Sequence, residues 1–218
     1  MINTAEISRS FVSSMTGSRL EPYPYNYWVL DRPLPDGTGE AVAALPIVPA
    51  DIEDTCGKRE TNNATRVHFS PALQTRFPVV KAIAEAFQDP FVVGALEETC
   101  GIDLEGSFLR IELCQDKGGF WLQPHTDIGA KLFTMMIFLC EGEGAENWGT
   151  DVLDADHNLV THAPCGFNIG MIFIPGENTW HSFQERPIDG VRRSLMVNYV
   201  KNEWRSTHEL SFPDQPIQ

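Results

Sequence analysis

The chain has 218 residues, and 42% of them are hydrophobic, which is enough for one domain with a full core. Its 30 acidic residues outnumber 16 basic ones and give a formal net charge of −14. Nucleic acids and anionic membranes attract proteins through clustered Lys and Arg, so this charge argues against both as partners. We therefore expect a single domain over residues 1–218, without a sequence signal for a particular oligomeric state.

The sequence also favours a cytoplasmic setting. No secretory signal is recognised near the N-terminus, and the apolar run Phe133–Cys140 is too short to span a bilayer. The five cysteines are widely spaced and contain no Cys-x-x-Cys pair, which argues against a disulfide framework or a zinc knuckle. We expect all five to be buried, reduced thiols.

The N-terminal part predicts a helix followed by extended segments. Residues 2–16 form an amphipathic helical pattern. Its apolar side chains recur every four positions, at Ile7, Phe11 and Met15. Tyr23–Asp31 is rich in aromatic and β-branched residues and predicts a strand. Val42–Pro49 predicts either a second strand or a short buried segment.

The next part of the chain predicts a loop and two helices. Asp51–Arg66 is polar, with charges of both signs and no periodicity, so we expect an exposed loop that covers a site. Pro78 suits the first turn of a helix, and the residues after it supply an apolar face. Asp89-Pro90 ends this helix and starts another over Phe91–Cys100.

From Ser107 onward the pattern changes to short strands separated by turn residues. The expected strands are Ser107–Leu113, Phe120–Asp127, Leu132–Leu139, Thr150–Leu153, Leu159–His162, Met171–Ile174, Thr179–Phe183 and Arg192–Val200. Such a series predicts a double-sheet jelly roll or barrel, that is, an all-β core with a few flanking N-terminal helices. We assign residues 1–106 to an N-terminal strand and supporting helices, 107–201 to the β core, and 202–218 to a C-terminal tail.

Two candidate metal ligands stand close together in the segment Gln123-Pro124-His125-Thr126-Asp127. Successive side chains of a strand point to opposite faces, so His125 and Asp127 share a face if both lie on one strand. His181 is the third candidate ligand. The chain between Asp127 and His181 is long enough to form several strands and to return to the same end of a barrel. Two histidines and one carboxylate can hold an octahedral Fe(II) and leave three positions open for a chelating co-substrate and dioxygen.

A candidate carboxylate anchor lies on the last expected strand. Arg192 and Ser194 share one face of it, and the opposite face carries Arg193 and three apolar residues. By this alternation Arg192 faces a polar pocket, where its guanidinium can fork a carboxylate. If the strand register shifts by one residue, Arg193 takes this place instead.

Several pieces of the sequence occur in an order that is typical of one enzyme family. They are Gly118-Gly119 before the ligand strand, the HxD motif His125-Thr126-Asp127, the distal His181, and the RxS motif Arg192-Arg193-Ser194, with softer matches at Tyr23–Leu34 and Trp148-Gly149-Thr150. On these pieces the chain resembles the Fe(II)/2-oxoglutarate-dependent oxygenases, and most closely their prolyl-hydroxylase-like branch. HxD alone is common by chance, but the three motifs in order are a specific signal.

This resemblance implies a double-stranded β-helix in which Fe(II) is held by His125, Asp127 and His181. It also implies that Arg192, with Ser194, binds the 5-carboxylate of 2-oxoglutarate. In the family, dioxygen and 2-oxoglutarate oxidise an organic substrate with release of succinate and CO₂. The organic substrate of this chain is not identified by its sequence. Retention of an aspartate in the HxD motif favours hydroxylation or another oxygenation over halogenation.

One departure from the family pattern concerns the partner of Arg192. The prolyl-hydroxylase-like branch often has a tyrosine that touches the co-substrate, where this chain has Phe138. The resemblance therefore leaves Thr134 and Ser194 as the residues that can assist Arg192.

Other polar and aromatic side chains near these motifs are expected to have ordinary roles. Lys131 is expected to be solvated, as most lysines are, with a contact to an acidic residue as the alternative. Arg110 is expected to pair with Glu112, and Trp148 to face a substrate or to anchor a lid.

Two further functions use the same ligands. A cupin-like metal enzyme without 2-oxoglutarate would give Arg192 no necessary role. A non-catalytic β-barrel could keep a metal for structure, although structural sites usually close the coordination sphere, which three protein ligands do not.

Overall fold

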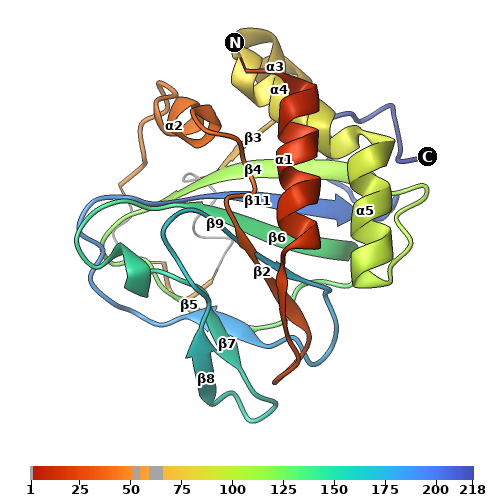
Figure 1. Ribbon diagram of the computed structural model, residues 1–218. Coiled ribbons are helices and arrows are strands. Elements are labelled where there is room, and N and C mark those ends of the chain that lie inside the picture. The colour runs from red at the N-terminus through yellow and green to blue at the C-terminus, as the bar shows by residue number, and fades with distance from the viewer. Residues whose placement is uncertain (1, 52–54, 59–65) are drawn as a thin grey trace.

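Two antiparallel sheets stack on each other, and helices cover the outer face of the larger one (Figure 1). The structure is a computed structural model that describes residues 2–51, 55–58 and 66–218. Within these ranges the strands are β1 (Arg19–Glu21), β2 (Tyr27–Asp31), β3 (Arg66–His68), β4 (Phe108–Asp116), β5 (Leu122–His125), β6 (Lys131–Leu139), β7 (Asp151–Leu153), β8 (Leu159–His162), β9 (Phe167–Phe173), β10 (His181–Phe183) and β11 (Arg192–Val200). The larger sheet has the order β1-β2-β9-β6-β11-β4-β3, and the smaller one β5-β10-β7-β8. The jelly-roll prediction is confirmed, with more strands than expected.

The helices that cover the larger sheet begin and end where local sequence signals place them. They are α1 (Thr4–Thr16), α4 (Pro78–Gln88) and α5 (Pro90–Cys100), with the shorter α2 (Thr38–Ala43) and α3 (Pro71–Arg76) beside them. The Asn3 side chain caps α1 by accepting the Ala5 N–H, and Asp89 caps α5 in the same way. Gly101 ends α5 at a φ of 67°, a left-handed conformation that suits glycine. The three long helices were all predicted.

The larger sheet has an apolar face toward the helices and a mixed face toward the smaller sheet. On β11, Leu195, Val197 and Tyr199 pack in the core beneath the helices. The alternate residues Arg192 and Ser194 line a pocket between the two sheets. The central strand β6, between β9 and β11, is buried along nearly its whole length, as expected for a strand covered on both sides.

The prediction for Val42–Pro49 is wrong. The chain forms helix α2 from Thr38 to Ala43 and then a loop. Alanine is the strongest helix former, and this short Ala-rich stretch buries Val42 through a helical turn instead of a strand. The strand expected from Tyr23 also begins later, at Tyr27, where pairing with β9 starts.

Edge elements and part of one loop differ from the expectations as well. Most of the loop expected over Asp51–Arg66 lies outside the described residues, but Arg66 itself is buried and starts β3. β1, β3 and α3 were not predicted. All five cysteines are described and none forms a disulfide. Only Cys114 and Cys140 are buried, whereas Cys100 and Cys165 are partly buried and Cys56 is exposed. No helix in the described ranges has the length and hydropathy needed to cross a bilayer.

Candidate metal and co-substrate site

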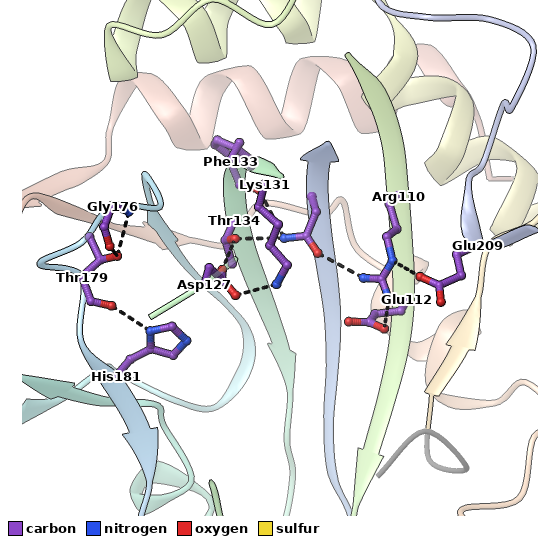
Figure 2. A network of polar contacts seen from close by, with 11 residues as sticks. Arg110, Glu112, Asp127, Lys131, Phe133, Thr134, Gly176, Thr179, His181 and Glu209 are labelled. Atoms are coloured by element: carbon purple, nitrogen blue, oxygen red, sulfur yellow. Dashed lines mark hydrogen bonds and ion pairs between the residues drawn. The ribbon is translucent and has the colours of Figure 1, made fainter. Parts of the chain in front are cut away.

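The two candidate histidine ligands lie side by side because β5 and β10 are paired. The register sets His181 opposite His125, and their ring centroids are 4.2 Å apart. In each ring Nδ1 contacts a backbone carbonyl. For His125 it is that of Gln123, at 2.8 Å, and for His181 it is that of Thr179, at 2.9 Å (Figure 2). A carbonyl only accepts, so Nδ1 carries the proton and Nε2 keeps the lone pair of a neutral imidazole. Metal-binding histidines are commonly oriented by such contacts.

Burial keeps His181 in the form that binds metals. The residue is 8% exposed. Burial, together with the neighbouring His125, lowers the pKa of His181 to about 4. The ring is therefore neutral at pH 7, and its Nε2 lone pair is available to a cation.

Asp127 lies beyond the strand on which it was expected. β5 ends at His125, and a turn closed by the Lys131 N–H and the Ile128 carbonyl follows. Strand alternation therefore does not set the direction of Asp127. The turn nevertheless brings Asp127 into the same pocket as both histidines.

The carboxylate of Asp127 is held by two partners from β6. Lys131 Nζ lies 2.6 Å from Oδ1, and Thr134 Oγ1 donates to Oδ2 at 2.6 Å (Figure 2). Burial alone would raise the pKa of Asp127, but the Lys131 ammonium and these hydrogen bonds outweigh it and hold the pKa well below its usual range. The expectation that Lys131 is solvated is wrong, because the ion pair allows this lysine to be only 5% exposed.

The donor set fits Fe(II) in kind, but it is not preassembled around a cation. Within the described ranges, no three His, Cys, Asp or Glu side chains are placed as a ready metal cluster. Two imidazoles with open Nε2 atoms and one ionised carboxylate nevertheless line a single pocket, which is the donor chemistry of a facial triad. A cation bound by all three would share the carboxylate now held by Lys131.

Arg192 points into the pocket, and Arg193 points away from it. The Arg192 Nε donates to the Trp148 carbonyl at 2.7 Å, and Nη1 donates to Asp116 at 2.8 Å. Its Nη2 makes no hydrogen bond within the described part of the chain. The guanidinium carbon lies 4.4 Å from the centre of the Phe183 ring. Arg193, on the other face of β11, donates to the Gln115 side chain.

The two residues named as helpers of Arg192 lie in different parts of the pocket. Ser194 follows Arg192 on the same face of β11 and is 1% exposed. Thr134 pairs with Asn198, further along β11, and its hydroxyl is engaged with Asp127. Phe138 lies opposite Ser194 in the strand register, with its ring centre 5.6 Å from the Arg192 guanidinium carbon.

A row of cross-strand contacts supports the end of the pocket where Asp127 lies (Figure 2). Thr134 accepts a hydrogen bond from Asn198 Nδ2 at 2.9 Å, and the Asn198 Oδ1 accepts one from Arg110 at 3.2 Å. Arg110 also pairs with Glu112 at 2.9 Å, as expected, and with Glu209 at 2.6 Å. Thr134, Asn198 and Arg110 are neighbours in the strand register of β6, β11 and β4, so the sheet itself positions the Thr134 hydroxyl.

Sequence reasoning missed two buried charges of the pocket region, and the tryptophan it singled out is buried. Asp116 was missed because the expected strand ended at Leu113, although continued alternation would have put it on the face of Arg110. Arg66 was assigned to an exposed loop, but it lines the pocket. Trp148, expected to face a substrate or anchor a lid, is 1% exposed and donates its indole N–H to the Pro187 carbonyl.

The fold has clear relatives among solved structures, whereas no family model and no curated protein matches the sequence. It is similar to a prolyl 4-hydroxylase from Phytophthora capsici, with a TM-score of 0.60, 17% identity, and coverage of 93% of this chain and 67% of that one. A prolyl-4-hydroxylase from Pseudomonas putida gives a TM-score of 0.57 at 13% identity, covering 90% and 95%. HygX from Streptomyces hygroscopicus, solved with nickel and 2-oxoglutarate bound, gives 0.51 at 10% identity, covering 82% and 83%. The chain therefore has the fold of the 2-oxoglutarate- and Fe(II)-dependent oxygenases, and prolyl 4-hydroxylases are among its structural neighbours.

Proposed function

We propose that this chain is a non-haem Fe(II)- and 2-oxoglutarate-dependent oxygenase that hydroxylates an organic substrate. The observation that carries the proposal is one pocket lined by His125, Asp127 and His181 together with Arg192 and Ser194. Such a set offers three metal ligands and a separate carboxylate anchor. The likeness of the fold to 2-oxoglutarate oxygenases supports the same function.

The residues of the pocket would have two roles, one group binding the metal and the other binding the distal carboxylate of 2-oxoglutarate. When bound, Fe(II) supplies the chemistry by which dioxygen and the keto acid oxidise the substrate and leave succinate and CO₂. His125 and His181 would offer Nε2, because their Nδ1 atoms are fixed by backbone carbonyls. Asp127 would offer its carboxylate, oriented by the Thr134 hydroxyl.

At the other part of the pocket, Arg192 would bind the distal carboxylate of 2-oxoglutarate, and the Ser194 hydroxyl would assist it. The ring centres of Phe120, Phe138 and Phe183 lie 4.4 to 5.8 Å from the Arg192 guanidinium carbon. These rings reduce the access of water, and a charge-assisted hydrogen bond is stronger where water is excluded.

Anaerobic binding tests the proposal directly. Fe(II) and 2-oxoglutarate together should give the protein a weak visible absorption band that is lost in His125→Ala. In air, slow conversion of 2-oxoglutarate to succinate should follow. His208→Ala, at an exposed histidine, serves as the matched control and should keep both signals. If the wild-type protein, with fresh iron and reductant, neither binds nor converts 2-oxoglutarate, the proposal is refuted.

Arg192→Gln separates this function from a cupin-like metal enzyme. Under the proposal the variant still binds metal, but its affinity for 2-oxoglutarate falls. An enzyme without a keto-acid co-substrate would keep its activity after this change.

A further inference from the structure

Arg66 is a second arginine of the same pocket, and the sheet places it beside the Arg192 anchor. It pairs with Cys114 on β4, and Cys114 in turn pairs with Ser194 on β11. Arg66 and Ser194 therefore share one cross-strand row at two strand spacings, roughly 10 Å. The next row on the same face, two residues along the strands, holds the pair Asp116 and Arg192. Both arginines thus project from neighbouring rows on the same face of the larger sheet.

The two guanidiniums lie around one aromatic ring. The guanidinium carbon of Arg66 is 5.9 Å from the centre of the Phe120 ring, and that of Arg192 is 5.8 Å from it. The Arg66 side chain is 4% exposed. A charge that is so deeply buried is costly unless it is paired and hydrogen-bonded.

The pairing of Arg66 within the protein is incomplete. Its Nε is buried and has no hydrogen-bond partner among the described residues. The Arg66 Nη2 lies 3.6 Å from Asp116 Oδ1, beyond ordinary hydrogen-bond length. In the part of the chain that the structure describes, this oxygen also has no hydrogen-bond partner. Because Arg66 lines the pocket, an unsatisfied donor on this side chain indicates an acceptor that arrives with a ligand.

The charge balance indicates which acceptor fits. Arg66 and Arg192 carry two positive charges beside the one negative charge of Asp116. Glu112 also acts on Arg66, but its carboxylate is paired with Arg110, so Arg66, Arg192 and Asp116 together leave an excess of one positive charge. A single carboxylate neutralises it, and its two oxygens can accept from both guanidiniums.

We propose that Arg66 acts together with Arg192 to bind the distal carboxylate of the 2-oxoglutarate co-substrate. The inference rests on the proposed function and extends it by one residue that the sequence motifs do not contain. Arg66 also borders an outer groove with His68, Arg76 and His208. If Arg66 instead bound the carboxylate of another substrate from this groove, substitution of Arg66 would not change the affinity for 2-oxoglutarate.

The experiment compares two keto acids that differ only in the distal group. Binding of 2-oxoglutarate and of 2-oxovalerate, which has a methyl group in place of the distal carboxylate, is measured by titration calorimetry with Mn²⁺ in place of Fe(II). Arg66→Gln should weaken 2-oxoglutarate binding by roughly 10- to 100-fold, as expected for a lost charge-assisted hydrogen bond. The affinity of Arg66→Gln for 2-oxovalerate should stay within about threefold of the wild-type value. Arg76→Gln, at an exposed arginine of the outer groove, is the control and should change neither affinity.

A second variant keeps the test decisive if Arg66→Gln does not fold. Arg66→Lys keeps the positive charge beside Asp116 but loses the bidentate geometry of the guanidinium. The ratio of its affinities for 2-oxoglutarate and 2-oxovalerate should therefore be smaller than that of wild type. If wild type prefers 2-oxoglutarate and Arg192→Gln abolishes this preference, but the Arg66 variants keep it, the inference is overturned and the proposed function stands. If wild type binds neither keto acid, the proposed function fails and the inference fails with it.

Discussion

Lys131→Met tests how the protein neutralises Asp127 before a metal arrives. The Lys131 Nζ lies 2.6 Å from Asp127 Oδ1, and the two side chains are 3% and 9% exposed. Methionine keeps most of the apolar stem, so the change mainly removes the charge. Removing one partner of a buried ion pair costs about 3–5 kcal/mol, since the other charge is left uncompensated. For a chain of this size each kcal/mol lowers Tm by about 2–4 °C, so the metal-free variant should melt roughly 6–20 °C below wild type.

A divalent cation should reverse much of this loss. In wild type, a metal that binds Asp127 competes with the Lys131 ammonium, whereas in the variant it meets an unpaired carboxylate. A ligand at 100 times its Kd stabilises a protein by about 2.7 kcal/mol. We expect Mn²⁺ affinity to rise about tenfold in Lys131→Met, which adds about 1.4 kcal/mol at the same metal concentration.

Differential scanning calorimetry with and without Mn²⁺ measures both quantities. Lys201→Met is the matched control, because Lys201 lies at the same groove as Lys131 but is exposed. It should change neither the Tm of the metal-free protein nor the shift caused by Mn²⁺. Equal metal shifts in wild type and Lys131→Met would show that the cation does not bind Asp127, and the reasoning would be refuted.

Two other substitutions probe the support of the site and the fold. Asn198→Leu removes the hydrogen-bonded link between Arg110 and Thr134. The Mn²⁺ affinity, measured by calorimetry, should fall roughly 10-fold, as for other residues that orient metal ligands. An unchanged affinity would mean that Asn198 is not needed to position Thr134. Gly149→Ala would set a Cβ 1.8 Å from the Ala163 carbonyl oxygen, so we expect a loss of about 4 kcal/mol or more in thermal unfolding. Its control is Gly94→Ala, where the added Cβ meets nothing within 4 Å, and a stable Gly149→Ala protein would contradict the packing.

The residues predicted best from the sequence are those on strongly patterned strands. Arg192 was assigned to the pocket and Arg193 away from it because apolar side chains alternate along the rest of β11. His181 was recognised by its motif, and the structure places it opposite His125 through strand pairing. In such segments the alternation of apolar and polar residues indicates which side chains face the core and which face away from it.

The sequence could not predict features that depend on where pairing stops or on contacts between distant segments. Asp127 was given a direction by strand alternation, but hydrogen bonding of β5 ends at His125, and no residue pattern marks this end. Lys131 is buried only because Asp127 turns back to meet it. Arg66 lies in a polar stretch without periodicity and becomes part of the sheet through pairing with β4, far along the chain. Local propensity contains no information about such pairing.

The alternation of β11 has a consequence for how this chain can change over time. One set of its side chains makes the pocket and the other set makes the core, so the two are interleaved one residue at a time. Single substitutions can modify either set separately. An insertion or deletion of one residue within β11 would exchange the two sets, so that Arg192 would leave the pocket and the apolar side chains would leave the core. We therefore expect the number of residues in β11 to tolerate change less well than the identity of any one of its side chains.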